Sequence, residues 1–257
     1  MNDASIPHAL TPPGQFDAAC RSLGLELSDD ERAALGRYLH LLLETNKRFN
    51  LTAIREPGEA WMRHILDSLT LLPQLPAAEQ ADAADDPPRP EMTLIDVGTG
   101  GGLPGIVLAI VLADWRVTLL EATGKKARFC EQAAGALGLG NVTVVNDRAE
   151  AAGRQREHRQ RYAIAVARAV GPMRVMLEYT LPLVRVGGRV LAMKGQRVTD
   201  ELDEAGDALM TLGGGNVELY DAWPDSDWGG AIVSIEKVAA TPKAYPRRPG
   251  EPKANPL

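Results

Sequence analysis

The chain has 257 residues, of which 45% are hydrophobic and 24% are charged, and its formal net charge is -6 at pH 7. This length and composition fit one α/β domain with an appendage, and the negative charge excludes attachment to nucleic acid through a uniformly basic surface. The sequence has no apolar run long enough to span a bilayer and no signal-peptide pattern at its start, so we expect a cytoplasmic protein without membrane contact.

The first part of the chain is predicted to be helical. Residues 15–23 form a short helix, residues 28–31 form a capping box that begins a second helix, and residues 61–69 carry an apolar stripe typical of a third. We therefore expect a helical N-terminal extension over residues 1–76. An Ala-, Asp- and Pro-rich linker follows over residues 77–90.

The most informative stretch is TLIDVGTGGGLPG, at residues 93–105. A short apolar run contains Asp96 near its end and leads into four closely spaced glycines, followed by Leu103 and Pro104. Glycines packed this closely let the backbone turn sharply and let a ligand lie against it. The order of strand, glycine-rich turn and helix predicts a nucleotide-type pocket at the carboxyl end of a parallel sheet.

Two cofactor classes fit this loop. The spacing G-x-G-x-x-G over residues 100–105 matches the dinucleotide fingerprint, in which a helix start holds a pyrophosphate. The spacing D-x-G-x-G-x-G over residues 96–102 is the signature of S-adenosylmethionine (SAM) methyltransferases. Asp96 would repel a pyrophosphate but suits a methionine ammonium group, so the pattern favours SAM. Glu121, at the end of the next predicted strand, can accept from ribose hydroxyls in either class.

From residue 92 onward, strand and helix patterns alternate, which indicates parallel βαβ units. The strands are expected at residues 93–97, 116–121, 142–146, 162–167 and 189–193, and the helices at 104–113, 124–138, 172–184 and 199–212. Two further strand-like runs, 217–223 and 231–238, would close the sheet as an antiparallel hairpin. We therefore expect a Rossmann-like class I SAM-dependent methyltransferase domain over residues 91–257, with a seven-stranded, mostly parallel sheet and a C-terminal antiparallel hairpin.

Candidate binding residues follow the later strands of this predicted sheet. Ala149 and Glu150 come after the third strand, Arg168 after the fourth and Lys194 after the fifth, which points them at one cleft. No Asn/Asp-Pro-Pro-Tyr/Phe motif follows the fourth strand, and no cysteine stands at a strand end, so methylation of an exocyclic amine or of cytosine carbon is disfavoured. A site without an evident base suits an acceptor with a free lone pair, such as guanine N7.

The two cysteines, Cys20 and Cys130, lie far apart on helix-like segments, so we expect buried apolar side chains and no metal site. Basic residues gather around Lys125 and Lys126, at residues 154–161 and in the C-terminal tail. Such patches can bind phosphate even where the net charge is negative.

At these residues the sequence closely resembles the ribosomal small-subunit RNA methyltransferase G family, also called glucose-inhibited division protein B. The resemblance runs from about residue 41 to residue 257. Its markers are Asn46-Lys47, Asn50-Leu51-Thr52, residues 63–69, the loop at 96–105, Glu121 with Gly124-Lys125-Lys126, Arg148-Ala149-Glu150, Arg168-Ala169, Lys194-Gly195-Gln196 and Tyr245-Pro246-Arg247-Arg248. The resemblance implies SAM-dependent methylation of guanine N7 in 16S rRNA, in the loop beside the decoding site.

The resemblance also implies roles for individual residues, which we combine with the patterns above. Arg168 and Lys194 would orient the guanine or its phosphates, without a general base. The expected cofactor residues are Gly98, Gly100, Leu103, Glu121, Ala149, Glu150 and Arg168. The expected RNA contacts are Asn46, His64, Lys125, Lys126, Lys194, Arg247 and Arg248. An equal alternative is that His64 and Asp67 are a structural pair that docks the N-terminal helices on the sheet.

The sequence departs from the family pattern in places. Thr45 stands where the family often has tryptophan, and residues 77–90 and 154–161 look like additions without a catalytic role. The expected partner is 16S rRNA or the small ribosomal subunit, and we expect a monomer. The alternatives left open are a nicotinamide-dependent oxidoreductase, a non-catalytic rRNA-binding or assembly protein and a small-molecule methyltransferase.

Overall fold

The centre of the computed structural model is a seven-stranded sheet with the order β3-β2-β1-β4-β5-β7-β6. The model describes residues 8–76, 92–223 and 230–257, so the predicted linker at 77–90 lies outside the described residues. The strands are β1 (Thr93–Val97), β2 (Arg116–Leu120), β3 (Val142–Val145), β4 (Tyr162–Arg168), β5 (Val184–Lys194), β6 (Gly214–Asp221) and β7 (Ala231–Lys237). Strands β1 to β5 pair in parallel, and β7 is antiparallel to both β5 and β6. The predicted sheet and its C-terminal hairpin are confirmed.

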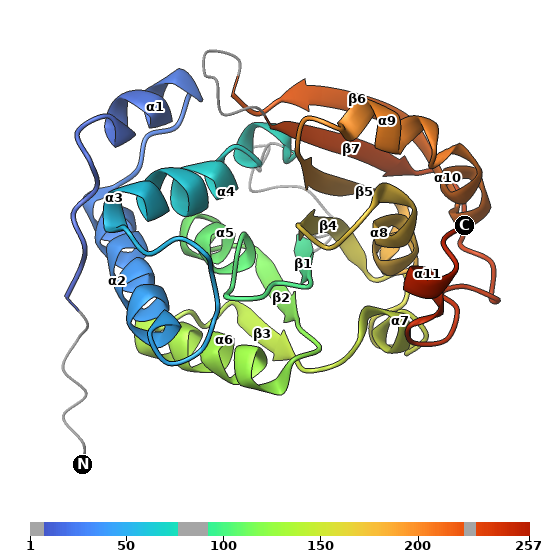
Figure 1. The fold of residues 1–257 in the computed structure, drawn as a ribbon, viewed down its shortest axis with the longest axis horizontal. Helices are drawn as coiled ribbons and strands as arrows, with labels where there is room; N and C mark the ends of the chain where they lie inside the picture. The colour runs from blue at the N-terminus through green and yellow to red at the C-terminus, as the bar shows by residue number, and fades with distance from the viewer. Residues whose placement is uncertain (1–7, 77–91, 224–229) are drawn as a thin grey trace, which may run out of the picture.

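Helices cover both faces of this sheet (Figure 1). One face packs against α5 (Gly105–Val111) and α6 (Gly124–Leu137), and the other packs against α8 (Met173–Thr180), α9 (Val198–Asp203) and α10 (Gly206–Leu212). Successive strand residues point to opposite faces, so neighbours such as Leu94 and Ile95 belong to different hydrophobic clusters. This explains why the parallel strands are mostly apolar on both faces.

The N-terminal helices lie against α5 and α6. They are α1 (Phe16–Ser22), α2 (Asp29–Asn46), α3 (Pro57–Ala60), a π-helical segment (Trp61–Leu66) and α4 (Asp67–Leu69), with a 3₁₀ turn at Leu72–Gln74. The predicted capping box begins α2: Glu31 N–H donates to Ser28 Oγ at 3.2 Å, and Ser28 N–H donates to the Glu31 carboxylate at 2.7 Å. Cys20 and Cys130 are buried as expected.

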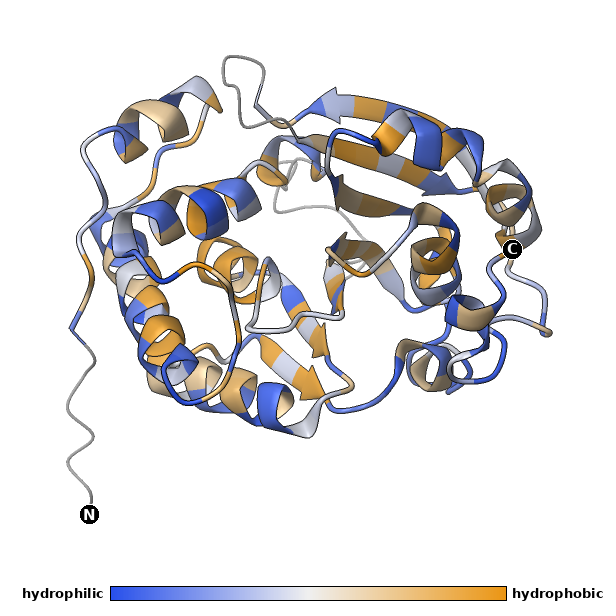
Figure 2. Cartoon of the chain, in the orientation of Figure 1, coloured by the Kyte–Doolittle hydropathy of each residue, from blue (hydrophilic) through white to orange (hydrophobic). Residues whose placement is uncertain are grey.

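Helix α5 is enclosed between the sheet and these helices, and Figure 2 shows it as almost entirely hydrophobic. A single hydrophobic cluster contains Leu39 and Trp61 together with Ile106 and Leu119. The Tyr38 hydroxyl reaches across this contact and donates to the Gly101 carbonyl at 2.7 Å. The predicted division into an N-terminal extension that ends at residue 76 and a domain that begins at residue 91 stays a prediction, although the two parts share one hydrophobic core.

Several element boundaries differ from the predicted ones for local reasons. Helix α8 ends at Thr180, four residues earlier than predicted, because Pro182 has no backbone N–H with which to continue the helical hydrogen bonds beyond Leu181. The predicted helix 199–212 is two helices, α9 and α10. The one-turn helices α7 (Ala149–Ala152) and α11 (Glu251–Ala254) are too short for a periodic pattern to reveal them. Within the described ranges, no helix has both the length and the apolar character needed to cross a membrane.

Candidate functional site

The glycine-rich loop leaves β1 at the carboxyl edge of the sheet. Gly98, Gly100 and Gly102 have φ values of 73, 60 and 91°, a left-handed backbone that residues with a Cβ rarely adopt. An added Cβ on Gly100 would have only the Gly98 carbonyl within 4 Å, at 3.9 Å, so this part of the loop faces open space. Gly100 therefore leaves bare backbone facing open space, and the predicted ligand contact of the loop stays a prediction.

Asp96 lies fully buried beneath this loop. Its Oδ2 accepts from the Thr99 hydroxyl at 2.6 Å and from Gly105 N–H at 2.8 Å. Its Oδ1 is buried and has no hydrogen-bond partner among the described residues. Burial raises the pKa of Asp96 to about 6. A buried carboxylate with an unsatisfied oxygen calls for a cationic or N–H donor, and the ammonium group of SAM fits that requirement.

Glu121 holds the loop from the side of β2. Its carboxylate accepts from Gly100 N–H at 2.9 Å and from Thr123 N–H at 2.7 Å, and only 6% of the residue is exposed. The acid thus ties the glycine loop to the start of α6. Asn146, at the end of β3, donates to the Glu121 carbonyl at 2.8 Å and links the third strand to the same edge. The predicted ribose contact of Glu121 stays a prediction.

A cavity of about 140 Å³ adjoins the loop, and we call it the cofactor cavity. It is lined by Val97, Gly98, Leu120, Ala122, Asp147, Arg148, Ala149, Glu150, Val170 and Tyr179. Three predicted cofactor residues, Gly98, Ala149 and Glu150, therefore meet at one cavity. Leu103 is 6% exposed and belongs to the hydrophobic cluster around α5, while Arg168 lines a different cavity.

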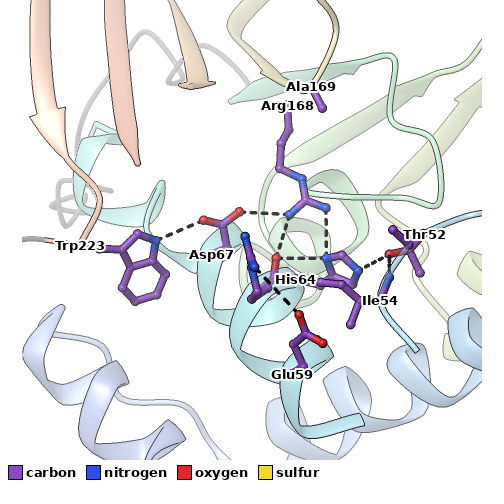
Figure 3. A pocket seen from close by; sticks show the side chains of 10 residues that line it. Thr52, Ile54, Glu59, His64, Asp67, Arg168, Ala169 and Trp223 are labelled. Carbon is purple, nitrogen blue, oxygen red and sulfur yellow. Dashed lines mark hydrogen bonds and ion pairs between the residues drawn. The ribbon is translucent and has the colours of Figure 1, made fainter. Parts of the chain in front are cut away.

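That second cavity has a volume of about 580 Å³ and lies between the N-terminal helices and the end of β4 (Figure 3). We call it the seam cavity. It is lined by Thr52, Ala53, Ile54, Glu59, Arg63, His64, Asp67, Arg168, Ala169 and Trp223. A third cavity of about 440 Å³ shares Arg63, Asp67, Arg168 and Ala169 with it and extends to Lys194.

Arg168 joins the two sides of the seam cavity. Its Nη1 lies 3.1 Å from Asp67 Oδ2 and donates to the Arg63 carbonyl at 3.2 Å. Trp223 Nε1 donates to the other Asp67 oxygen at 3.3 Å. Figure 3 shows the guanidinium directed from the strand end toward both Asp67 and His64. This pair connects β4 with the N-terminal helices.

His64 is 6% exposed and lies in the π-helical segment, a form of helix found often at functional sites. Its Nδ1 lies 3.0 Å from the Arg63 carbonyl and its Nε2 lies 2.6 Å from Thr52 Oγ1. The carbonyl can only accept, so this network assigns the proton to Nδ1, and Thr52 donates to Nε2. Burial, followed by the nearby Arg168 charge, lowers the pKa of His64 to about 4. Arg168 contacts both His64 and Asp67, so the arginine bridges the predicted structural pair.

Asn46 and Lys194 were both predicted to contact RNA, and both have protein partners; Asn46 is buried and Lys194 is partly buried. The Asn46 amide accepts from Leu51 N–H at 2.7 Å and from Thr52 N–H at 3.1 Å, and donates to the Thr52 carbonyl at 2.9 Å. Lys194 Nζ donates to the Gly171 carbonyl at 2.8 Å and lies 2.6 Å from Glu201 Oε2. Asn46 thus shapes the loop that carries Thr52, and Lys194 fastens the loop between β4 and α8.

The other predicted RNA contacts divide into exposed and partnered residues. Lys125 and Arg248 are exposed, Lys126 is half-buried, and the Lys125 ammonium lies 5.8 Å from the centre of the Phe49 ring. Arg247 instead pairs with Glu178, with Nη2 at 2.6 Å from Oε2. Within the described ranges, no group of three or more His, Cys, Asp or Glu side chains is placed to hold a metal ion.

Sequence reasoning did not assign Glu59, Asp67 and Trp223 to a binding cavity. Asp67 was considered as a structural partner only, and Trp223 lay at the end of a predicted edge strand. Neither motif nor spacing links these residues, since the seam cavity forms only when the N-terminal helices dock. The one sequence signal for this cavity was the family marker at residues 63–69, which contains Asp67.

Comparison with known proteins gives a consistent result. The sequence profile of the family described as rRNA small subunit methyltransferase G matches residues 31–222. A protein from Alkaliphilus metalliredigens is 38% identical over 239 residues, covering 93% of this chain and 95% of that protein. One from Desulforamulus reducens is 36% identical and covers 100% of both chains, and one from Chloroflexus aggregans is 41% identical, covering 91% of this chain and 93% of that protein. Each carries the name ribosomal RNA small subunit methyltransferase G.

Proposed function

The chain belongs to the rRNA small subunit methyltransferase G family, and we propose that it transfers the methyl group of SAM to N7 of a guanine in 16S rRNA. One observation carries this proposal: consecutive residues at the end of β4 line two cavities. Val170 lines the cofactor cavity, whereas Arg168 and Ala169 line the seam cavity. A methyl donor in the first cavity and an acceptor base in the second would meet across this short turn.

Ala169 supports the proposal because its φ of 57° is uncommon for a residue with a Cβ. Such backbone costs free energy, and it persists where the surrounding structure demands it, often at functional sites. Here it lies between the two cavities. We infer that the turn at 168–170 sets the separation and direction of donor and acceptor.

SAM, when bound, supplies a methyl group on a sulfonium, which is an electrophile that needs no further activation. Guanine N7 would form the new N–C bond as the C–S bond breaks, the electron pair of that bond would stay on sulfur, and the positive charge would pass to the purine. N7 carries no proton, so this chain needs no general base. Its residues contribute by in-line positioning and by stabilising the developing charge.

The seam cavity provides groups of the right kind for these tasks. The Asp67 and Glu59 carboxylates line it and can accept from the N–H groups of a guanine, and their negative charge favours a cationic product. Arg168 can donate to the guanine carbonyl oxygen while its pairing with Asp67 keeps it in place. His64, whose pKa is lowered to about 4, is neutral near pH 7 and acts as a positioning group.

For the cofactor, we propose that Gly98, Gly100, Ala149 and Glu150 line the nucleoside path, with Glu121 on the ribose and Asp96 below the ammonium. The unsatisfied Asp96 oxygen favours SAM over a nicotinamide dinucleotide, because a pyrophosphate would meet a buried carboxylate. For the RNA, we propose Lys125, Lys126 and Arg248 as direct contacts, since these residues are exposed or half-buried. Asn46 and Lys194 would act through the loops that they hold. We place the enzyme in the cytoplasm, with its ribosomal substrate.

The test is aniline cleavage at N7-methylguanosine in 16S rRNA from cells with and without the gene. We expect one cleavage site to disappear when the gene is deleted, and to return when the purified protein and SAM are added to deficient small subunits or to their extracted 16S rRNA. An unchanged cleavage pattern would overturn the proposal. RNA binding without methyl transfer would indicate an assembly protein, and a thermal shift with NAD but not with S-adenosylhomocysteine (SAH) would indicate an oxidoreductase.

A further inference from the structure

The C-terminal tail, residues 241–257, is held against α7, α8 and the segment after α7 by specific hydrogen bonds and an ion pair. Two arginines in the segment after α7 bind its main chain. Arg159 donates to the carbonyls of Thr241 and Tyr245, both at 2.7 Å. Arg154 donates to the Pro246 carbonyl at 2.8 Å and to the Ala244 carbonyl at 3.0 Å. The arginine-rich segment that looked like an addition is therefore a clamp for the tail.

Two buried glutamates receive the tail from the other side. Glu178 in α8 is fully buried, and its carboxylate accepts from Arg247 N–H at 2.6 Å and from Arg247 Nη2 at 2.6 Å. Hydrogen bonding to this carboxylate raises the pKa of Arg247. Glu150 in α7 is 3% exposed and accepts from Gly250 N–H at 2.7 Å. Each glutamate would be a buried, unpaired charge if the tail were displaced.

The two glutamates lie on α7 and α8, the helices that form one wall of the cofactor cavity. Glu150 lines that cavity itself, and Tyr179, the neighbour of Glu178, lines it from α8. Helix α7 also packs directly on the tail, since a Cβ added to Gly153 would lie 2.9 Å from the Pro246 ring. Figure 1 shows α7, α8 and α11 gathered at the same end of the sheet, away from the N-terminal helices. The tail thus braces the α7–α8 wall, and the seam cavity lies on the other side of the β4 turn.

We propose that the tail is a positioning element for the cofactor: Arg247 holds α8 through Glu178, Gly250 holds α7 through Glu150, and these two helices form one wall of the cofactor cavity. This inference rests on the proposed SAM site, and it replaces a direct RNA contact by Arg247 with an indirect role in cofactor binding. By linkage, cofactor binding must then stabilise the docked tail to the same degree as the tail favours cofactor binding.

The first test compares Arg247→Ala with Lys253→Ala, a variant that removes an exposed cation from the same tail. We expect the Kd of SAH and the KM of SAM to rise about tenfold in Arg247→Ala, with RNA affinity within about twofold of wild type. Lys253→Ala should leave the affinity for SAH and the affinity for RNA unchanged. Arg247→Lys should recover little, because an ammonium cannot reproduce the forked contact with Glu178. Wild-type SAH affinity in Arg247→Ala with weakened RNA binding would overturn the inference.

The second test uses the wild-type chain and does not depend on a variant that folds. Hydrogen exchange is measured with and without saturating SAH. We expect amide exchange in residues 241–250 to slow by about tenfold or more with SAH, as reciprocal coupling requires. Unchanged exchange in the tail, with SAH bound and the glycine loop protected, would contradict the inference. A wild-type chain that binds no SAH at all would instead count against the proposed function.

Discussion

Arg168 and Asp67 form an ion pair, at 3.1 Å, between the last residue of β4 and the first residue of α4. The pair lines the seam cavity and joins the N-terminal helices to the strand whose next residues reach the cofactor cavity. On the proposed function, we expect the geometry of this pair to affect folding and catalysis together.

Replacing Arg168 by Ala should impair both properties. The change leaves Asp67 partly buried without its cation, so we expect a loss of about 1–3 kcal/mol in the free energy of unfolding, less than for a fully buried pair. Methyl transfer should fall by about 100-fold, because the acceptor loses its positioning group. Denaturant unfolding and single-turnover transfer from labelled SAM measure the two effects.

Arg197→Ala, at an exposed i,i+3 pair with Asp200, is the matched control and should change stability by less than about 0.5 kcal/mol. Full transfer activity in Arg168→Ala would remove this residue from the site.

Cofactor affinity should depend on the charge of Asp96. The pKa of Asp96 is raised by burial to about 6, so the carboxyl is largely ionised at pH 7.5 and largely protonated at pH 5. A protonated carboxyl no longer attracts an ammonium, and SAH affinity should fall as the pH drops through about 6. Isothermal titration between pH 5 and 8 measures this, and Asp96→Asn should bind SAH about tenfold or more weakly with a flatter profile. If the SAH affinities of wild type and Asp96→Asn changed with pH in parallel, the placement of Asp96 at the ammonium group would be contradicted.

His64 should contribute a distinct pH dependence of stability. The pKa of His64 is lowered to about 4 in the folded chain, below its ordinary value of 6.5. Between these values the unfolded chain binds a proton that the folded chain does not, so stability must fall as the pH decreases from about 6.5 to about 4. The loss should reach up to about 3 kcal/mol. The difference between wild type and His64→Gln in urea unfolding isolates the effect, with the exposed His8→Gln as control. A constant difference over this range would show that His64 is protonated in the folded state.

Two glycine substitutions should have opposite effects on stability. A Cβ on Gly105 would lie 2.2 Å from Leu119 Cδ2 and 2.7 Å from Asp96 Oδ2, so Gly105→Ala should destabilise the chain by about 1–3 kcal/mol and weaken SAH binding. A Cβ on Gly135, in the last turn of α6, meets nothing within 4 Å. Gly135→Ala should therefore stabilise the chain by about 0.5–1 kcal/mol without affecting SAH. Thermal unfolding with and without SAH distinguishes the two variants. If both variants melted at the wild-type temperature, both predictions would be contradicted.

The sheet could be predicted closely because its signals are local. The apolar runs, the glycine loop and the turn residues set β1 at the predicted residues and most other strands within a residue or two. The glycine loop, Ala149 and Glu150 were predicted to share a cavity because parallel strands end at one edge of a sheet. Short helices and helix ends were less predictable, since they depend on single residues such as Pro182.

The partners of the charged side chains could not be predicted. Arg168 and Arg247 pair with carboxylates 101 and 69 residues away in sequence, and Lys194 pairs with Glu201 on the following helix, which no motif marked as its partner. Whether a cation at a strand end meets RNA or a buried glutamate is decided by how the N-terminal helices and the tail dock. A sequence pattern shows where a cation lies along the chain, but not which group it meets in the folded protein.

The enclosure of α5 has a consequence for how this chain is made. The apolar faces of α2 and the π-helical segment are buried only when these helices pack on α5, which follows them in the chain. During synthesis, which proceeds from the N-terminus, these helices leave the ribosome before their partner exists. They must remain loosely formed, or sheltered by a chaperone, until β1 and α5 emerge.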